Sequence, residues 1–149
     1  MSLEWDALQA VAGYWQSKII PESEAALTAD QVCVDYPDVD KMPHPVMLYL
    51  IPENGTAEPE TTQSDLETLN MTAYLLCKFD SSHKTMPALI EEAFEYYGAL
   101  AGAMIDDPTV GRAVMESRIE SFDFYPAITG LANSVGIEIK LNAKFERSA

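Results

Sequence analysis

Apolar residues recur along this chain at two different spacings, and the spacing separates helical segments from strands. Between Met86 and Ile105 they recur every three to four positions, which predicts one long amphipathic helix. Thr85 stands where an N-cap is expected, Pro87 is tolerated in the first turn, and the run Asp106-Asp107-Pro108 ends the helix. The same spacing from Glu4 to Ile20 predicts a second helix, which a proline ends.

Other segments show the two-residue alternation or the short apolar run of strands. The predicted strands occupy residues 31–36, 46–51, 66–79, 117–125 and 136–146. Val46 to Ile51 is continuously apolar between two prolines, which predicts a strand buried on both faces. Gly136 to Glu146 alternates without interruption, as expected for a strand with one buried face. In the strand 117–125 the apolar phase slips between Ile119 and Phe122, which indicates a β-bulge.

The order of these elements predicts the fold class. Strands come in runs and do not alternate with helices, which favours an α+β fold over an α/β fold. We therefore expect a single largely antiparallel sheet of four to five strands, covered on one face by two helices. The polar positions of the long strands should line the other face. A chain of 149 residues is most simply one domain, spanning residues 1–149.

Residues 52–65 interrupt this pattern. The segment PENGTAEPETTQSD has two prolines and no large apolar side chain, so it predicts a long, exposed, acidic loop. Its carboxylates are Glu53, Glu58, Glu60 and Asp65. Two interpretations stay open: a solvated surface of a monomer, or a loop that contacts a partner.

Charge narrows the possible partners. The formal net charge is −15, from nine basic and 24 acidic residues, so binding to nucleic acid through phosphate neutralisation is not expected. No apolar run reaches the length of a membrane span, and no signal peptide is recognisable at the start. Cys33 and Cys77 lie in strand-like runs, where buried free thiols are favoured over a disulfide.

No pattern in the chain predicts catalysis. Asp35, Asp38, Asp40 and His44 crowd one connector, but its spacing is not that of a calcium loop, so no metal and no cofactor are expected. The chain lacks a nucleophile elbow, a phosphate-binding glycine loop and an HExxH motif. Gly98 and Gly102, four residues apart in the long helix, predict close helix packing. We therefore expect that the protein is not an enzyme.

One local motif and the order of elements point to a family. After the long helix comes IDDPTVGRAV, then a strand, a short loop and the closing alternating strand GIEIKLNAKFE. This arrangement resembles the tail-terminator, tail-completion and head–tail joining (neck) proteins of long-tailed bacteriophages and prophages. The motif is their aspartate-proline-threonine-apolar-glycine turn; the family often has a second glycine where this chain has Arg112. The turn residues here are Asp107, Pro108, Thr109, Val110 and Gly111.

The resemblance implies a structural role. Such proteins assemble into rings, often hexameric, on tail-tube or neck proteins, first in the host cytoplasm and then in the virion tail or neck. DNA passes through the ring without specific binding, and carboxylates facing the lumen would repel its phosphates. In the family the long loop meets neighbouring subunits or the tube, which would be the role of the acidic segment 52–65. Two alternatives stay open: a cytoplasmic adaptor or chaperone domain that uses an exposed sheet edge, and a small enzyme with a pocket between sheet and helices.

Overall fold

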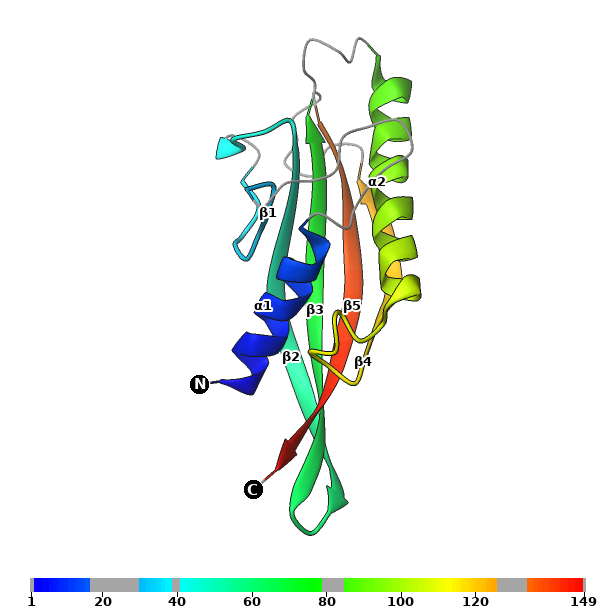
Figure 1. Ribbon diagram of the computed structural model, residues 1–149. Coiled ribbons are helices and arrows are strands. Elements are labelled where there is room, and N and C mark those ends of the chain that lie inside the picture. The colour runs from blue at the N-terminus through cyan, green and yellow to red at the C-terminus, as the bar shows by residue number, and fades with distance from the viewer. Residues whose placement is uncertain (1, 17–29, 39–40, 79–84, 126–133, 149) are drawn as a thin grey trace.

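The computed structural model describes residues 2–16, 30–38, 41–78, 85–125 and 134–148. Two helices and five strands follow one another along these residues (Figure 1). In chain order they are α1 Leu3–Trp15, β1 Val32–Cys33, β2 Val46–Thr61, β3 Ser64–Lys78, α2 Met86–Asp106, β4 Glu116–Tyr125 and β5 Ser134–Ser148.

Both helices begin where the sequence predicts. The side chain of the N-cap Thr85 accepts a hydrogen bond from Ala88 N at 3.3 Å, and Pro87 lies in the first turn of α2. The side chain of Ser2 caps α1 in the same way, by accepting from Trp5 N at 3.2 Å. Asp107 is the C-cap of α2, as the proline after it requires. The continuation of α1 predicted through residue 20 lies outside the described residues beyond Gln16.

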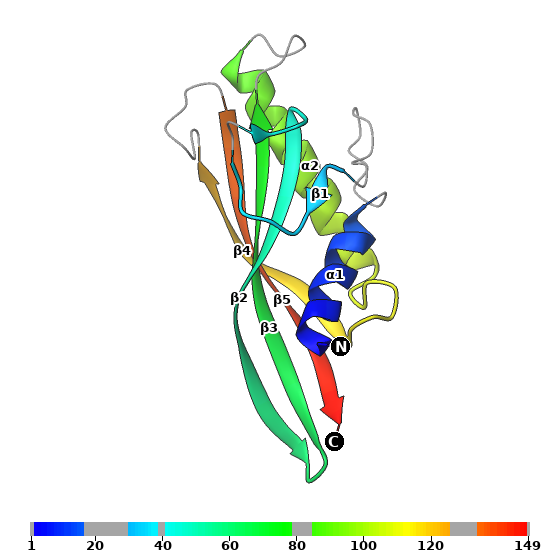
Figure 2. The ribbon, with the colours of Figure 1, turned by 90° about the vertical axis from the view of Figure 1, so that its left-hand side faces the viewer.

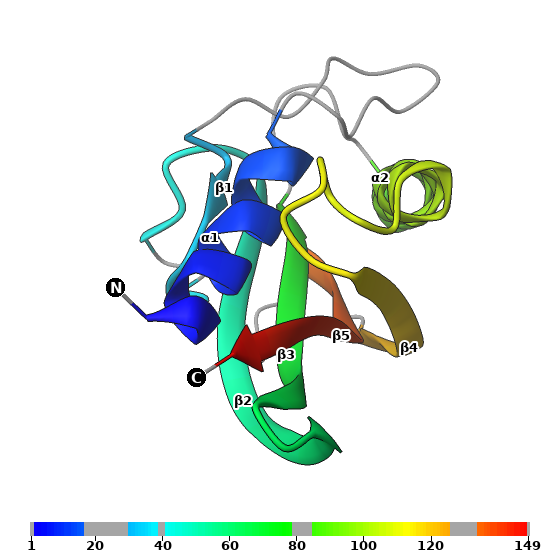
Figure 3. The same ribbon diagram turned by 60° about the horizontal axis from the view of Figure 1, so that its bottom comes forward.

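The five strands form one sheet in the order β1-β2-β3-β5-β4. β1 runs parallel to β2, and every other neighbouring pair is antiparallel. Both helices lie on the same face of this sheet (Figure 3). The main core lies between the helices and that face, with Trp15, Leu89, Leu100, Ile137 and Ile139 fully or almost fully buried. The predicted α+β class with a largely antiparallel sheet is confirmed.

The opposite face carries a small apolar cluster of its own. Met47, Tyr49 and Leu76 are buried there, with Cys33 and Met42 packed against them. Val46, Leu48 and Leu50 point into the main core. The strand predicted at 46–51 is therefore buried on both faces, as its continuous apolar run indicated, and the second face is not purely polar.

The strand predicted at 31–36 is wrong in extent. Only Val32 and Cys33 pair with β2, and Tyr36 is 74% exposed. Alternation over six residues was compatible with a strand, but the chain leaves the sheet after two residues.

The segment 52–65, predicted to be an exposed loop, is exposed, but the loop conformation is wrong because most of the segment is strand. Residues 52–61 continue β2, and Ser64 and Asp65 already belong to β3. The ladder continues from Asn54–Asn70 to Thr61–Ser64, and we call residues 54–70 the hairpin arm. The arm projects beyond the helices (Figure 2). Residues 52–61 are strand because they pair with β3. The other edge of β3 is paired with β5 as far as the Ser64–Ser148 pair.

The predicted bulge in β4 is confirmed, because its register with β5 shifts between Ile119 and Ser121. The alternation of β5 is also confirmed: its five predicted inward residues, Ile137, Ile139, Leu141, Ala143 and Phe145, are all buried in the main core. One outward residue differs from expectation, since Asn142 is only 5% exposed.

The expectations for the two cysteines and for the two glycines of α2 have different outcomes. Cys33 and Cys77 form no disulfide, as expected; Cys77 is buried, whereas Cys33 is only half-buried. The close packing predicted at Gly98 and Gly102 is wrong: both are exposed, and a Cβ added at either would meet no atom within 4 Å.

Candidate functional site

The carboxylate of Glu53 belongs to a polar cluster at the base of the hairpin arm. Glu53 is the extra residue at a register shift of β2 between Pro52 and Asn54. Its Oε1 accepts a hydrogen bond from Lys140 Nζ of β5 at 2.6 Å and another from the hydroxyl of Thr72. Lys140 Nζ also lies 3.0 Å from Glu138 Oε1. The cluster therefore joins β2, β3 and β5 on the face without helices.

The charges in this cluster hold each other ionised. The hydrogen bond from Lys140 is the main reason why the pKa of Glu53 lies below its ordinary value. Reciprocally, the hydrogen bond to Glu53 is the main reason why the pKa of Lys140 is raised. A lysine held so firmly as a cation is suited to fixing strands and not to accepting a proton, so we read the cluster as structural.

The other three predicted carboxylates lie on the hairpin arm and do not converge. Glu58 pairs in register with Leu66, on the face without helices. Asp65 pairs with Pro59 on one side and Arg147 on the other. Glu60 lies at the second register shift of β2, next to the turn. All three are exposed, so the structure separates Glu53, which is bound at the base, from these charges along the arm.

Arg147 ties the sheet to the first helix. Its Nε donates to Glu67 Oε2 at 2.8 Å, and its Nη2 donates to Glu4 at the start of α1. Because the Arg147 side chain is 42% exposed, we expect a modest contribution to stability that falls with salt. Nothing in the sequence pattern signalled this contact between residues 143 positions apart.

The family-like turn is organised by the carboxylate of Asp107. Its Oδ1 accepts from Thr109 Oγ1 at 2.6 Å and from Thr109 N at 3.0 Å, and its Oδ2 accepts from Gly111 N at 2.9 Å. The hydrogen bond from the Thr109 hydroxyl, followed by that from Gly111 N–H, holds the pKa of Asp107 below its ordinary value. The five predicted turn residues are therefore brought together, and they form a self-contained turn.

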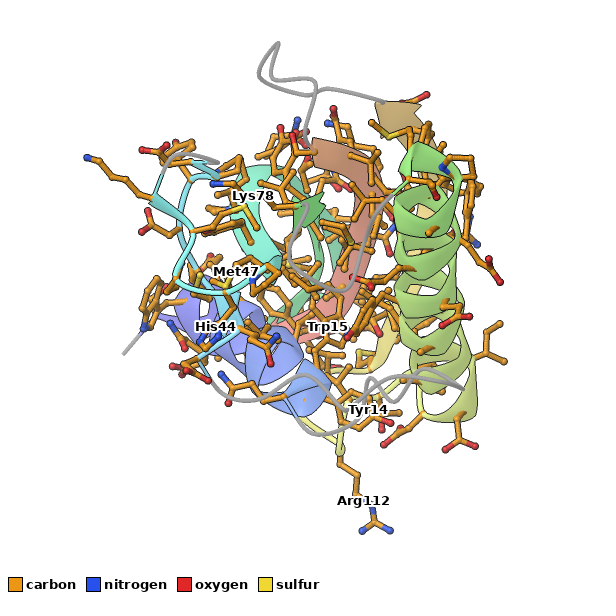
Figure 4. All side chains as sticks on the ribbon, turned by 90° about the horizontal axis from the view of Figure 1, so that it is seen from above. Tyr14, Trp15, His44, Met47, Lys78 and Arg112 are labelled. Carbon is orange, nitrogen blue, oxygen red and sulfur yellow. The ribbon has the colours of Figure 1, made fainter. Side chains whose placement is uncertain are left out.

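The backbone of this turn is left-handed over three residues, with φ of 43° at Val110, 76° at Gly111 and 69° at Arg112. Two of the three are not glycine, which costs conformational energy that the turn must offset. Val110 contributes by burying its side chain in the core. The Arg112 side chain extends away from the body (Figure 4). Ser117 Oγ donates to Pro108 O at 2.8 Å and so joins the turn to β4.

A groove between α2 and β4 is the feature that sequence reasoning missed. Its volume is about 700 Å³, and its floor and walls combine one face of α2 with residues 116–122 of β4. Aromatic pairs span the two elements: the ring centroids of Tyr97 and Phe122 are 4.5 Å apart, and those of Phe94 and Phe124 are 5.4 Å apart. Ile105 at the rim is 81% exposed. The sequence placed Ile105 at the end of an apolar run, and only the structure shows that it is uncovered.

Two polar groups of the groove-lining residues take part in structural contacts. The Ser117 hydroxyl is committed to Pro108 O, and the carboxylate of Glu120 accepts from Asn142 Nδ2. Neither group is paired with a histidine or lysine that could act as a base in the part of the chain that the structure describes. The expectation that the protein is not an enzyme stays a prediction.

Three of the four connector residues considered as possible cation ligands, Asp35, Asp38 and His44, are among the described residues. Across the ranges that the structure covers, no group of three or more histidine, cysteine or acidic side chains is placed to hold a metal ion. His44 Nε2 lies 2.7 Å from Asp30 Oδ2. Asp40 lies outside the described residues. Neither described helix is long and apolar enough to cross a lipid bilayer.

The sequence matches no protein-family model and no curated protein. Among solved structures, the chain is similar to one described as "Virion of native gene transfer agent (GTA) particle", with a TM-score of 0.47 and 13% identity. The match covers 80% of this chain and 81% of that chain. A likeness of this degree does not establish a family.

Proposed function

We propose that this protein is a structural component of a phage or prophage virion, a tail terminator or head–tail joining subunit that acts by assembling into a ring. The observation that carries the proposal is the hairpin arm, which extends β2 and β3 beyond the part of the sheet that the helices cover (Figures 1 and 2).

The β2 half of the arm contributes little to the stability of a single chain. Every residue from Pro52 to Thr61 is exposed, so this half of the hairpin buries almost no apolar surface. A two-stranded ribbon alone is marginal in water, and here β5 supports only the β3 side. A long, ordered, uncovered arm is instead typical of a surface that contacts another chain.

Two further features agree with this proposal. The sequence resemblance rests on the Asp107–Gly111 turn and on the order of elements, and the turn is locally well formed. The formal charge of −15 and the exposed carboxylates of Glu58, Glu60 and Asp65 suit a ring through which DNA passes without adhering. We assign the arm to the contact with neighbouring subunits or with the tail tube.

Solution mass and electron microscopy test the proposal. Light scattering of the purified chain should give a mean mass above the 16.4 kDa of one chain, and this mass should rise with protein concentration toward that of a ring. Negative-stain images should show rings. A variant with Glu58, Glu60 and Asp65 changed to lysine should assemble at least about tenfold less tightly. The matched control changes three exposed acids away from the arm, Asp6, Asp35 and Glu91, to lysine and should assemble at least as well as the original.

Two results would contradict the proposal. A single-chain mass at all accessible concentrations with no rings on the grid would refute ring assembly. Unchanged assembly of the arm variant would leave a ring but would remove the arm from its interface.

A further inference from the structure

We propose that the groove between α2 and β4 binds an extended segment of a different protein, with apolar side chains that fill the groove and basic residues that flank them. The inference concerns a second surface, remote in sequence from the hairpin arm, and it does not depend on ring assembly.

The shape of the groove suits a peptide. Its volume of about 700 Å³ falls within the range of binding pockets, and it runs along an element instead of closing around one point. From α2 it is lined by Tyr97, Ala101, Met104 and Ile105, which share one side of the helix. From β4 it is lined by residues 116–122, so its long direction follows the strand.

Large apolar side chains border the groove and stay exposed. Ile105 is 81% exposed and Phe122 is 45% exposed, and both line the groove. Single exposed apolar residues are ordinary, but a contiguous set around a groove marks an interaction site.

The edge of β4 provides the second means of recognition. β4 ends the strand order, and within the described ranges no strand pairs with its outer edge. The backbone N–H and C=O groups along that edge can therefore accept an added strand. An added strand would direct alternate side chains into the groove, next to Ile119 and Phe122, and the others to the face without helices.

Charge selects the kind of partner. β4 carries Glu116 and Glu120 against one cation, Arg118. In the register with β5 these side chains lie toward the face without helices, where the flanking side chains of an added strand would also lie. On the groove side, the exposed Asp106 follows Ile105 directly. The whole chain carries a formal charge of −15, so a second copy would bring more negative charge to an acidic rim. A segment with lysine or arginine beside its apolar residues would be attracted instead.

A labelled peptide tests the proposal. The probe is a fluorescein-labelled strand-length peptide of about ten residues that alternates lysine and valine, and its control alternates glutamate and valine. Fluorescence anisotropy should show saturable binding of the first peptide and none of the second. Ile105→Asp should weaken binding at least about tenfold, because it removes apolar contact. Tyr36→Asp, which adds the same charge at an exposed site outside the helices and strands, should leave the affinity unchanged within about twofold.

The sign of the Ile105→Asp effect separates groove binding from simple charge attraction. If the basic peptide only collects on an acidic surface, the added carboxylate would leave its affinity unchanged or strengthen it, and the proposal would be overturned. Equal weakening by Tyr36→Asp, or absence of saturable binding, would also overturn it. Self-association that Ile105→Asp abolishes would assign the groove to a second copy. Because ring formation is read from mass without peptide, either proposal can fail while the other stands.

Discussion

Gly111 and Gly102 offer the same chemical change, glycine to alanine, in two backbone conformations for which we expect opposite effects on stability. Gly111 lies in the turn after α2 with φ of +76°, whereas Gly102 lies within α2. A Cβ added at either position would meet no atom within 4 Å. Steric clashes with neighbours therefore cancel from the comparison, and only the backbone preference differs.

The magnitudes follow from that preference. Left-handed geometry costs an L-residue about 1–2 kcal/mol, and the smaller conformational freedom of unfolded alanine returns about 0.4–1 kcal/mol. Gly111→Ala should therefore lower the free energy of unfolding by about 1 kcal/mol. Gly102→Ala should raise it by about 0.5–1 kcal/mol, because alanine is the better helix former and the position is exposed.

Urea unfolding followed by circular dichroism measures both changes on one scale. In thermal unfolding, the expected difference between the two variants is roughly 3–8 °C for a chain of this size. If Gly111→Ala had the same free energy of unfolding as the unmodified protein, the left-handed turn would not exist in solution. A loss of stability in Gly102→Ala would show that this surface of α2 is packed against something.

Three further predictions concern the core, the polar cluster and the thiols. Ile139→Ala removes a fully buried side chain from β5 and should cost about 3 kcal/mol in urea unfolding; a cost below about 1 kcal/mol would mean that β5 is not central to the core. The pKa of Glu53 is lowered from 4.5, so its pairing with Lys140 stabilises the fold above that value and is lost as the pH falls through the lowered folded pKa. Glu53→Gln should accordingly flatten the decline of the urea midpoint on acidification, and an unchanged decline would show that the pair does not persist in solution. Toward a thiol reagent at neutral pH, fully buried Cys77 should react only on unfolding, and Cys33 should react more slowly than a free thiol because burial, and then Asp35, raise its pKa. Rapid reaction of both would contradict the packing on the two faces of the sheet.

Periodicity located the elements whose side chains pack in one regular phase. The apolar residues of β5 alternate because one face lies under the helices, and the phase slip at Ile119 and Phe122 marked a real bulge. The caps of α2 were readable because a threonine and a proline have local conformational effects. In each case the residues of the segment itself determine its structure, so the sequence of that segment is enough to predict it.

The hairpin arm could not be predicted in this way, because its strand character comes from its neighbours. Residues 52–61 have two prolines and no large apolar side chain, which locally resembles a loop. They are strand because β3 offers them a ladder, and β3 is itself held by β5. The groove was missed for a related reason: an apolar run does not show which of its side chains a neighbouring element covers, and the tertiary arrangement leaves Ile105 open.

The strand order has a consequence for how this protein is made. β5 is the last of the described strands in the chain, yet it lies between β3 and β4, which do not pair with each other. While the ribosome is still synthesising residues 134–148, β4 therefore has no strand to pair with, and α2 lacks one of the strands on which its apolar side packs. Until residues 134–148 leave the ribosome, the unpaired β4 and the apolar side of α2 stay exposed and can aggregate. This is the interval in which chaperones would matter most.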